Sequence, residues 1–283
     1  MTTDIRRWDQ NREMREYHTD SFGIFFRTES TLYSGDSSFQ KIEVFANDTF
    51  GKVLLLDGLV QTTEKDEFFY HEMLVHPACV THPSPGTVLI LGGGDGGALK
   101  EVLRYPVKRV GHVEIDREVL AVAKKHFPWL SEVENDSRYE LYVDDGAEFL
   151  RRTEEKFDVV LIDSSEPIGP SAALHNRPFY ESLKRCLNPG GIVVPQLGSP
   201  FYHLAHIKES VSFFEDLFAE THLYTGPVPT YPGGIWCYGF LSDGTAPLQI
   251  RRNPPPALKY YNPDIHRAAF ALPAFMADTL SSS

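Results

Sequence analysis

The stretch LILGGGDGGALKE, residues Leu89 to Glu101, sets a run of glycines between an apolar segment and a segment with helical spacing. Glycines at the end of a strand allow a tight turn and a close approach between the backbone and a ligand. The helix that follows presents unpaired N–H groups at its start. This order of strand, glycine loop and helix is typical of an α/β sheet that binds a nucleoside-containing ligand.

Apolar, β-branched runs alternate with amphipathic runs from Pro85 to Phe218. The expected strands are residues 87–91, 109–115, 139–143, 157–163 and 190–196, and the expected helices are residues 97–105, 117–127, 146–152, 177–187 and 203–218. The run IWCYGFLS, residues 235–242, is also strand-like. This alternation predicts a doubly wound, mostly parallel sheet, Rossmann-like and of the methyltransferase type. In such sheets ligands bind beyond the carboxyl ends of the strands.

The first part of the chain has a different pattern. Between Phe22 and Thr63 short apolar and polar runs alternate, with turn signals at Asn47-Asp48 and Asp57-Gly58. This pattern predicts hairpin-connected strands, and hence a small N-terminal antiparallel β domain at residues 1–65. Residues 66–80, DEFFYHEMLVHPACV, have helical spacing with acids in the first turn, so the larger domain is expected to cover residues 66–283.

Composition and charge narrow the classes of function. Hydrophobic residues make up 42% of the 283 residues, and no apolar run approaches the roughly 20 residues that span a bilayer. The first 20 residues lack the apolar segment of a signal peptide, so a cytoplasmic location is expected. A net charge of −12 disfavours nucleic acid and favours cationic small molecules. The three cysteines fit neither a disulfide framework nor a metal-ligand spacing and are expected to be reduced and buried.

Acidic residues follow the ends of successive strands. Asp95 lies inside the glycine loop, where a carboxylate would repel a phosphate and attract a cation. Glu114, in HVEID, follows the loop by about 20 residues, where an acid can bind ribose hydroxyls. Asp144 and Asp145 come next, in YVDDGAEFL. These acids suit a ligand that joins a nucleoside to positive charge, although each could instead cap the helix that follows it.

The stretch IDSSEPIGP, Ile162 to Pro170, ends the fourth expected strand of the larger domain on Asp163 and adds Glu166. Pro167 and Pro170 restrict the backbone around them, so both carboxylates are expected to be held in place. The alternative is an ordinary loop in which acids and serines cap the next helix.

These blocks resemble the polyamine aminopropyltransferase family. The resemblance covers nearly the whole chain and rests on blocks in family order: LLLDGLVQTTEKDEFFYHEML, LILGGGDGG, VEID, DDGAEF, IDSSEPIGP, VPTYPGG and YYNPDIHRAAFALP. It implies transfer of the aminopropyl group of decarboxylated S-adenosylmethionine to putrescine, which gives spermidine and methylthioadenosine. Other acceptors, namely cadaverine, agmatine or spermidine, remain open at this point. So do an S-adenosylmethionine-dependent methyltransferase and a non-catalytic polyamine-binding protein.

The resemblance also implies roles for individual residues. The donor would lie over the glycine loop at Gly92 and Gly94, with Glu114 on the ribose diol, Asp145 on the adenine amino group, Asp95 on the ammonium, and Gln40 and His71 on the N-terminal side. Asp163 would be the general base, with Tyr70 helping to orient the attacking amine. The acceptor would be lined by Gln61, Glu166, Gln196 and Tyr231.

Two departures from the family pattern lie on the acceptor side. Glu166 stands where the family usually has aspartate, and LGSP, which follows Gln196, lacks an acid that some members have. No cofactor and no metal is expected, because the co-substrate carries its own leaving group. The partners expected are the two small-molecule substrates and further copies of the chain, in a homodimer or a higher homo-oligomer through the N-terminal sheet.

Overall fold

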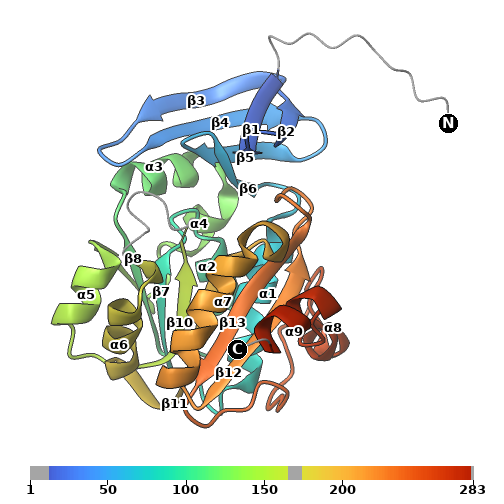
Figure 1. Ribbon diagram of the computed structural model, residues 1–283. Coiled ribbons are helices and arrows are strands. Elements are labelled where there is room, and N and C mark those ends of the chain that lie inside the picture. The colour runs from blue at the N-terminus through green and yellow to red at the C-terminus, as the bar shows by residue number, and fades with distance from the viewer. Residues whose placement is uncertain (1–12, 165–173, 282–283) are drawn as a thin grey trace. The chain divides into compact units, whose positions relative to one another are not determined.

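The parallel sheet predicted around Leu89 forms in the computed structural model of the chain (Figure 1), which describes residues 13–164 and 174–281. The chain divides into two units, residues 1–65 and 66–283. Glu166, Pro167 and Pro170 lie outside the described residues, so their predicted roles stay predictions.

The N-terminal unit is antiparallel throughout its described strands. A hairpin of β1 (Glu13–Thr19) and β2 (Phe22–Arg27) precedes a four-stranded sheet of β3 (Ser30–Asp36), β4 (Lys41–Asn47), β5 (Gly51–Leu56) and β6 (Leu59–Thr63), in that order. Asn47 closes the turn after β4, because its Oδ1 accepts hydrogen bonds from the N–H groups of Thr49 and Phe50, both at 2.9 Å. The small antiparallel domain predicted from the alternating pattern is thereby confirmed.

The second unit contains a seven-stranded sheet. Its order is β12-β13-β11-β10-β7-β8-β9, formed by β7 (Thr87–Gly92), β8 (Arg109–Glu114), β9 (Tyr139–Val143), β10 (Phe157–Asp163), β11 (Leu187–Gly198), β12 (Glu220–Pro227) and β13 (Ile235–Ser242). The strands from β11 to β9 run parallel, and β13 is antiparallel to both its neighbours. The predicted doubly wound, mostly parallel sheet is confirmed.

Helices cover both faces of this sheet (Figure 1). They are α1 (Glu67–Thr81), α2 (Gly97–Val102), α3 (Arg117–His126), α4 (Pro128–Val133), α5 (Gly146–Arg152), α6 (Arg177–Arg185), α7 (Pro200–Leu217), α8 (Pro263–Ala269) and α9 (Ala274–Ser281). Alternate residues of β7 serve the two faces: Val88 and Ile90 pack with α1 and α2, whereas Leu89 and Leu91 pack with α5, α6 and α7. Two apolar cores therefore hold the sheet between two helical layers.

The chain reverses its direction across the sheet between β7 and β10. From β7 the strands proceed to β8 and β9 on one side, whereas β10 and β11 lie on the other. Gly92, the last residue of β7, pairs with Asp163, the last residue of β10. A doubly wound sheet binds its ligand at this reversal, so a ligand site is expected at these two strand ends.

Two further expectations concern the cysteines and the membrane. Cys79, Cys186 and Cys237 are buried free thiols, as predicted. Within the described ranges no helix is both long and apolar enough to cross a bilayer.

Candidate active site

The backbone of the glycine loop after β7 is in close contact with side chains from β10 and α1. The N–H of Gly93 donates to the carbonyl of Asp163 at 2.7 Å, which joins the loop to the end of β10. Gly93 has a φ of +69°, and a β-carbon there would lie 2.5 Å from Oδ2 of Asp163. A β-carbon on Gly97 would lie 2.1 Å from the His71 ring. Glycine is needed at both positions because β10 and α1 bring their side chains against the loop backbone.

Helix α1 contributes Tyr70 and His71 to this place. The hydroxyl of Tyr70 donates to Oδ1 of Asp163 at 2.8 Å. Nδ1 of His71 lies 2.8 Å from Oε2 of Glu67, one turn earlier, and Nε2 lies 3.5 Å from Oδ2 of Asp95. The imidazole is thus held between two carboxylates, one on its own helix and one in the glycine loop.

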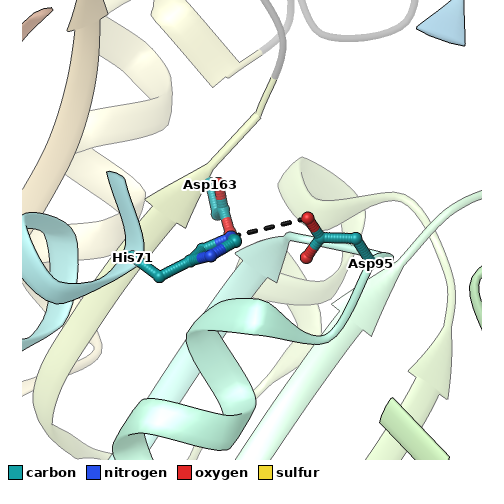
Figure 2. A group of neighbouring side chains, drawn as sticks. All are labelled: His71, Asp95 and Asp163. Carbon is teal, nitrogen blue, oxygen red and sulfur yellow. Dashed lines mark ion pairs between the residues drawn. The ribbon is translucent and has the colours of Figure 1, made fainter. Parts of the chain in front are cut away.

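Three side chains from three elements converge at this point, as Figure 2 shows. One ligand atom from each of His71, Asp95 and Asp163 lies within 4.8 Å of the others. Oδ1 of Asp95 accepts a hydrogen bond from the N–H of Gly97 at 2.8 Å, so its direction is set by the start of α2. Oδ2 of Asp163 is buried and has no hydrogen-bond partner within residues 13–164 and 174–281. The group has the donor set to hold a cation, either a metal ion or an ammonium.

The two aspartates differ in pKa because their surroundings differ. Burial raises the pKa of Asp163 to about 6; the nearby Asp95 carboxylate adds to the rise, while His71 and the Tyr70 hydrogen bond oppose it. Burial acts on Asp95 in the same sense, but the His71 charge and the Gly97 N–H outweigh it and hold the pKa of Asp95 below its usual value. Asp95 is therefore a fixed negative charge, whereas Asp163 can take up and release a proton near neutrality.

The neighbouring groups are held in their protonated forms. Burial and the charge of Asp163 raise the pKa of Tyr70 well above its usual value, so its hydroxyl remains a donor. Burial opposes protonation of His71, but Asp95 and Glu67 overcome it and raise the pKa of His71 well above its usual value. These partners therefore keep Tyr70 as a neutral hydrogen-bond donor and His71 as a cation.

Glu114 and Asp145 lie at the ends of the next two strands. Glu114 is the last residue of β8, lies against Gly94, and accepts a hydrogen bond from the N–H of Asp116 at 2.8 Å. Burial raises the pKa of Glu114 to about 7. Asp145 caps α5, because its Oδ1 accepts from the N–H groups of residues 147 and 148 at 2.8 and 2.9 Å. The alternative that this acid caps the following helix is therefore correct for one of the two carboxylate oxygens of Asp145.

Two of the residues predicted to line the acceptor, Gln196 and Tyr231, lie in the second unit and have different surroundings. Gln196 is buried in β11, and its amide is bonded to the protein: Nε2 donates to the carbonyl of Ser164 at 2.6 Å, and Oε1 accepts from Trp236 at 2.9 Å. Tyr231 packs with its ring centroid 5.8 Å from that of Tyr70 and 4.6 Å from that of Trp236. Gln196 is thus hydrogen-bonded to the residue that follows β10, and the Tyr231 ring packs beside the Tyr70 ring.

Gln40 and Gln61 belong to the N-terminal unit, and their approach to this site stays a prediction. Gln40 immediately precedes β4 and its N–H donates to Oγ of Ser37 at 3.1 Å. Gln61 is on β6, where its side-chain amide donates to the carbonyl of Leu59 at 3.1 Å.

Comparison with known proteins places this geometry in a family. A model described as "Spermine/spermidine synthase domain" matches residues 67–249, and one described as "Spermidine synthase tetramerisation domain" matches residues 14–64. The chain belongs to the spermine/spermidine synthase family. The polyamine aminopropyltransferase of Shouchella clausii is 41% identical over 268 residues, covering 94% of this chain and 98% of that protein. That of Moorella thermoacetica is 39% identical over 270 residues, covering 94% and 95%.

Solved structures of this family have the same fold. A spermidine synthase in complex with the transition-state analogue AdoDATO superposes with a TM-score of 0.93 at 37% identity and covers 99% of both chains. The spermidine synthase from Thermotoga maritima gives a TM-score of 0.91 at 36% identity, with complete coverage of both chains. The chain is accordingly an enzyme of the polyamine aminopropyltransferase kind.

Within this aminopropyltransferase, the sequence reasoning missed a chain of ionic contacts that begins at a partly exposed lysine and ends at the buried His71. Nζ of Lys100 on α2 lies 2.7 Å from Oε1 of Glu67, whose other oxygen binds His71. The spacing of Glu67 and His71, four residues apart on a predicted helix, was a usable signal for their contact. Lys100 had no such signal, because its partner lies on another helix.

Proposed function

We propose that this enzyme transfers the aminopropyl group of decarboxylated S-adenosylmethionine to putrescine and releases spermidine and methylthioadenosine. The observation that carries the proposal is the Tyr70–Asp163 pair. Its carboxylate has a pKa of about 6, a hydroxyl donor on Oδ1 at 2.8 Å and an Oδ2 with no protein donor among the described residues. Such a carboxylate is ionised at neutral pH and ready to accept a proton.

The proposed donor site runs along the ends of β7, β8 and β9. Glu114 would accept hydrogen bonds from the ribose diol, and Asp145 would use the oxygen not engaged in capping for the adenine amino group. The donor's ammonium would bind Asp95, whose depressed pKa keeps it negative. Because the ammonium would replace His71 as the cation beside Asp95, Nε2 of His71 would release its proton to solvent and accept a hydrogen bond from the ammonium. Nδ1 would keep its proton, hydrogen-bonded to Glu67 at 2.8 Å.

The proposed reaction uses Asp163 as general base. A primary alkyl ammonium has a pKa near that of lysine, about 10.4, and must lose a proton before its nitrogen can attack. The Asp163 carboxylate takes that proton, and the freed lone pair forms the new N–C bond at the methylene group beside the sulfonium. The C–S bond breaks with its electron pair moving to sulfur, so the positive sulfonium leaves as a neutral thioether. Atoms and charge balance with no metal or redox step.

The acceptor residues proposed from the family resemblance are Gln61, Glu166, Gln196 and Tyr231. Of these, Tyr231 borders the Tyr70 ring, and Gln196 acts through Ser164 and Trp236 because its amide is bonded to them. Putrescine is preferred in this proposal over cadaverine, agmatine and spermidine. The family membership favours aminopropyl transfer over the methyltransferase alternative, and the intact Tyr70–Asp163 pair favours an active enzyme over a silent binding protein.

The proposed assembly is a homo-oligomer formed through the N-terminal sheet. The match of residues 14–64 to the tetramerisation-domain model supports an oligomer, either the homodimer expected from the sequence or a larger form.

The deciding experiment combines substrates with the variant Asp163→Asn. The wild-type enzyme should convert decarboxylated S-adenosylmethionine and putrescine to spermidine, identified by mass spectrometry, with slower conversion of the other three amines. Asp163→Asn should lower turnover by about 10²- to 10⁴-fold, as expected for a lost general base, with unchanged donor affinity in calorimetry. The control is Asp144→Asn, which changes an acid that pairs with Arg152 at the end of β9, a strand that does not pair with β10. Near-normal turnover in Asp163→Asn would remove Asp163 from its assigned role.

A further inference from the structure

Asp66 uses its side chain in an unusual way for the residue that begins a helix. It occupies the N-cap position of α1, yet its carboxylate makes no hydrogen bond to the first turn. Instead Oδ2 accepts two hydrogen bonds from Thr230, from the N–H at 3.1 Å and from the hydroxyl at 2.7 Å. Both residues are buried, with exposed fractions of 6% and 4%. An aspartate at this position normally caps its own helix, whereas this carboxylate binds a segment far away in the sequence.

That segment is the loop between β12 and β13. The N–H of Val228 donates to Gly234 at 3.1 Å, that of Tyr231 donates to Val228 at 3.1 Å, and that of Gly234 donates to Tyr231 at 3.0 Å. These bonds set the shape of the loop but do not attach it to α1. Thr230, the residue immediately before Tyr231, attaches the loop to the start of α1 by hydrogen bonds.

Tyr231 and Tyr70 are therefore placed from the same anchor. Asp66 lies at the start of α1, four residues before Tyr70, and it holds the neighbour of Tyr231. The two rings pack with centroids 5.8 Å apart, and the Tyr70 hydroxyl reaches Asp163 at 2.8 Å. Because Tyr70 lies one turn after Asp66 on α1, the Asp66–Thr230 hydrogen bonds help to set the distance between Tyr231 and Tyr70.

We propose that Asp66 is a positioning residue that acts through Thr230 to hold Tyr231 against the acceptor side of the site. The inference rests on the proposed function, because it assigns the Tyr231 side to the acceptor amine. Asp66 touches no reacting group in this proposal. Its loss should weaken acceptor binding and leave donor binding, which uses the ends of β7, β8 and β9, unchanged. Small displacements of a binding group have large effects on an oriented reaction.

The first test is kinetic and uses Thr230→Val with Thr230→Ser as its matched control. Valine keeps the β-branched shape and removes the hydroxyl donor, whereas serine keeps that donor. Thr230→Val should raise the acceptor KM by about 3- to 30-fold, a part of what one hydrogen bond to a charged group contributes. The donor KM should stay within about twofold, and Thr230→Ser should resemble the wild type. Asp66→Asn should show the same split, and the double variant should be no worse than the more impaired single variant, because the two side chains act as one unit.

The second test does not depend on catalysis. Hydrogen exchange of the peptide that covers residues 228–234 should become faster in Thr230→Val and in Asp66→Asn but not in Thr230→Ser. A wild-type enzyme that forms no spermidine would overturn the proposed function, and the exchange measurement would still test the Asp66–Thr230 attachment. In an active enzyme, an unchanged acceptor KM in Thr230→Val would overturn the inference. So would equal rises in both KM values together with a lower melting temperature, since that result indicates a merely structural contact. Should Asp66→Asn fail to fold, Thr230→Val with its serine control still decides.

Discussion

Replacement of Tyr70 by phenylalanine removes a single hydroxyl from the proposed catalytic pair. That hydroxyl donates to Oδ1 of Asp163 at 2.8 Å and is one of the influences that lower the pKa of the carboxyl group. The phenyl ring can keep the packing against Tyr231 and Tyr238, both with centroids 5.8 Å from the Tyr70 ring. The substitution therefore perturbs the proton affinity of Asp163 more than the shape of the site.

The size of the effect follows from the hydrogen bond that is lost. A hydrogen bond to a charged group contributes about 1.5 to 3 kcal/mol, and one pKa unit corresponds to about 1.36 kcal/mol. The pKa of Asp163, about 6 in the wild type, should thus rise by about 1 to 2 units. A higher pKa means that the carboxyl stays protonated, and unable to act as a base, up to a higher pH. At pH 7 its ionised fraction should fall from about 0.9 to between about 0.1 and 0.5, which lowers kcat by about 2- to 10-fold.

The assay is the pH dependence of kcat between about pH 5.5 and 9.5 at saturating substrates. The acid limb of the profile should move to higher pH in Tyr70→Phe, and the variant should approach wild-type turnover near pH 9. Tyr142→Phe is the control, because that hydroxyl binds Glu140 on the surface of β9, at 2.9 Å. An equal loss at every pH, with the acid limb unmoved, would refute the argument and show that Tyr70 does not act through the pKa of Asp163.

Two further predictions concern stability and metal ions. Asp163 has a pKa of about 6 in the folded protein, above the unfolded value of about 3.9, so ionisation of its carboxyl group destabilises the fold. The stability that the protonated carboxyl contributes is present below about pH 4 and is lost as the pH rises through 6. Asp163→Asn should therefore be more stable than the wild type at pH 8, by up to about 3 kcal/mol, and this advantage should disappear below about pH 4; urea unfolding at both pH values checks it, and a less stable variant at pH 8 would contradict it. Although His71, Asp95 and Asp163 could hold a metal ion, the proposed cation is the donor's ammonium, so dialysis against EDTA should leave turnover unchanged, and loss of activity restored by one metal would contradict the ammonium assignment.

The architecture and the strand ends where chemistry can occur could be predicted from the sequence alone. Apolar runs that alternate with amphipathic runs specify a sheet with helices on both faces. A strand buried on both faces must be apolar throughout, and a helix that packs on a sheet needs one apolar face, whatever the detailed packing. Turn and glycine signals act over a few residues, so the loop after Gly92 and the acids Asp95, Glu114 and Asp163 could all be located by reading along the chain. The tail helices α8 and α9 were not predicted, although the cap Asn262 followed by Pro263 marks the start of α8.

The family resemblance grouped Tyr70 with Asp163, but the contacts between the side chains of the site became visible only in the folded chain. Tyr70 and Asp163 are 93 residues apart and meet because α1 packs against β10 and β11. Three contacts leave no periodic trace in the sequence: the ion pair of Lys100 with Glu67, the hydrogen bonds of the Gln196 amide to Ser164 and Trp236, and the hydrogen bonds of Thr230 to Asp66, 164 residues away. Periodicity and turn chemistry report on neighbours along the chain, whereas pKa values and hydrogen-bond partners depend on burial and on strand order, which appear only when the sheet has formed.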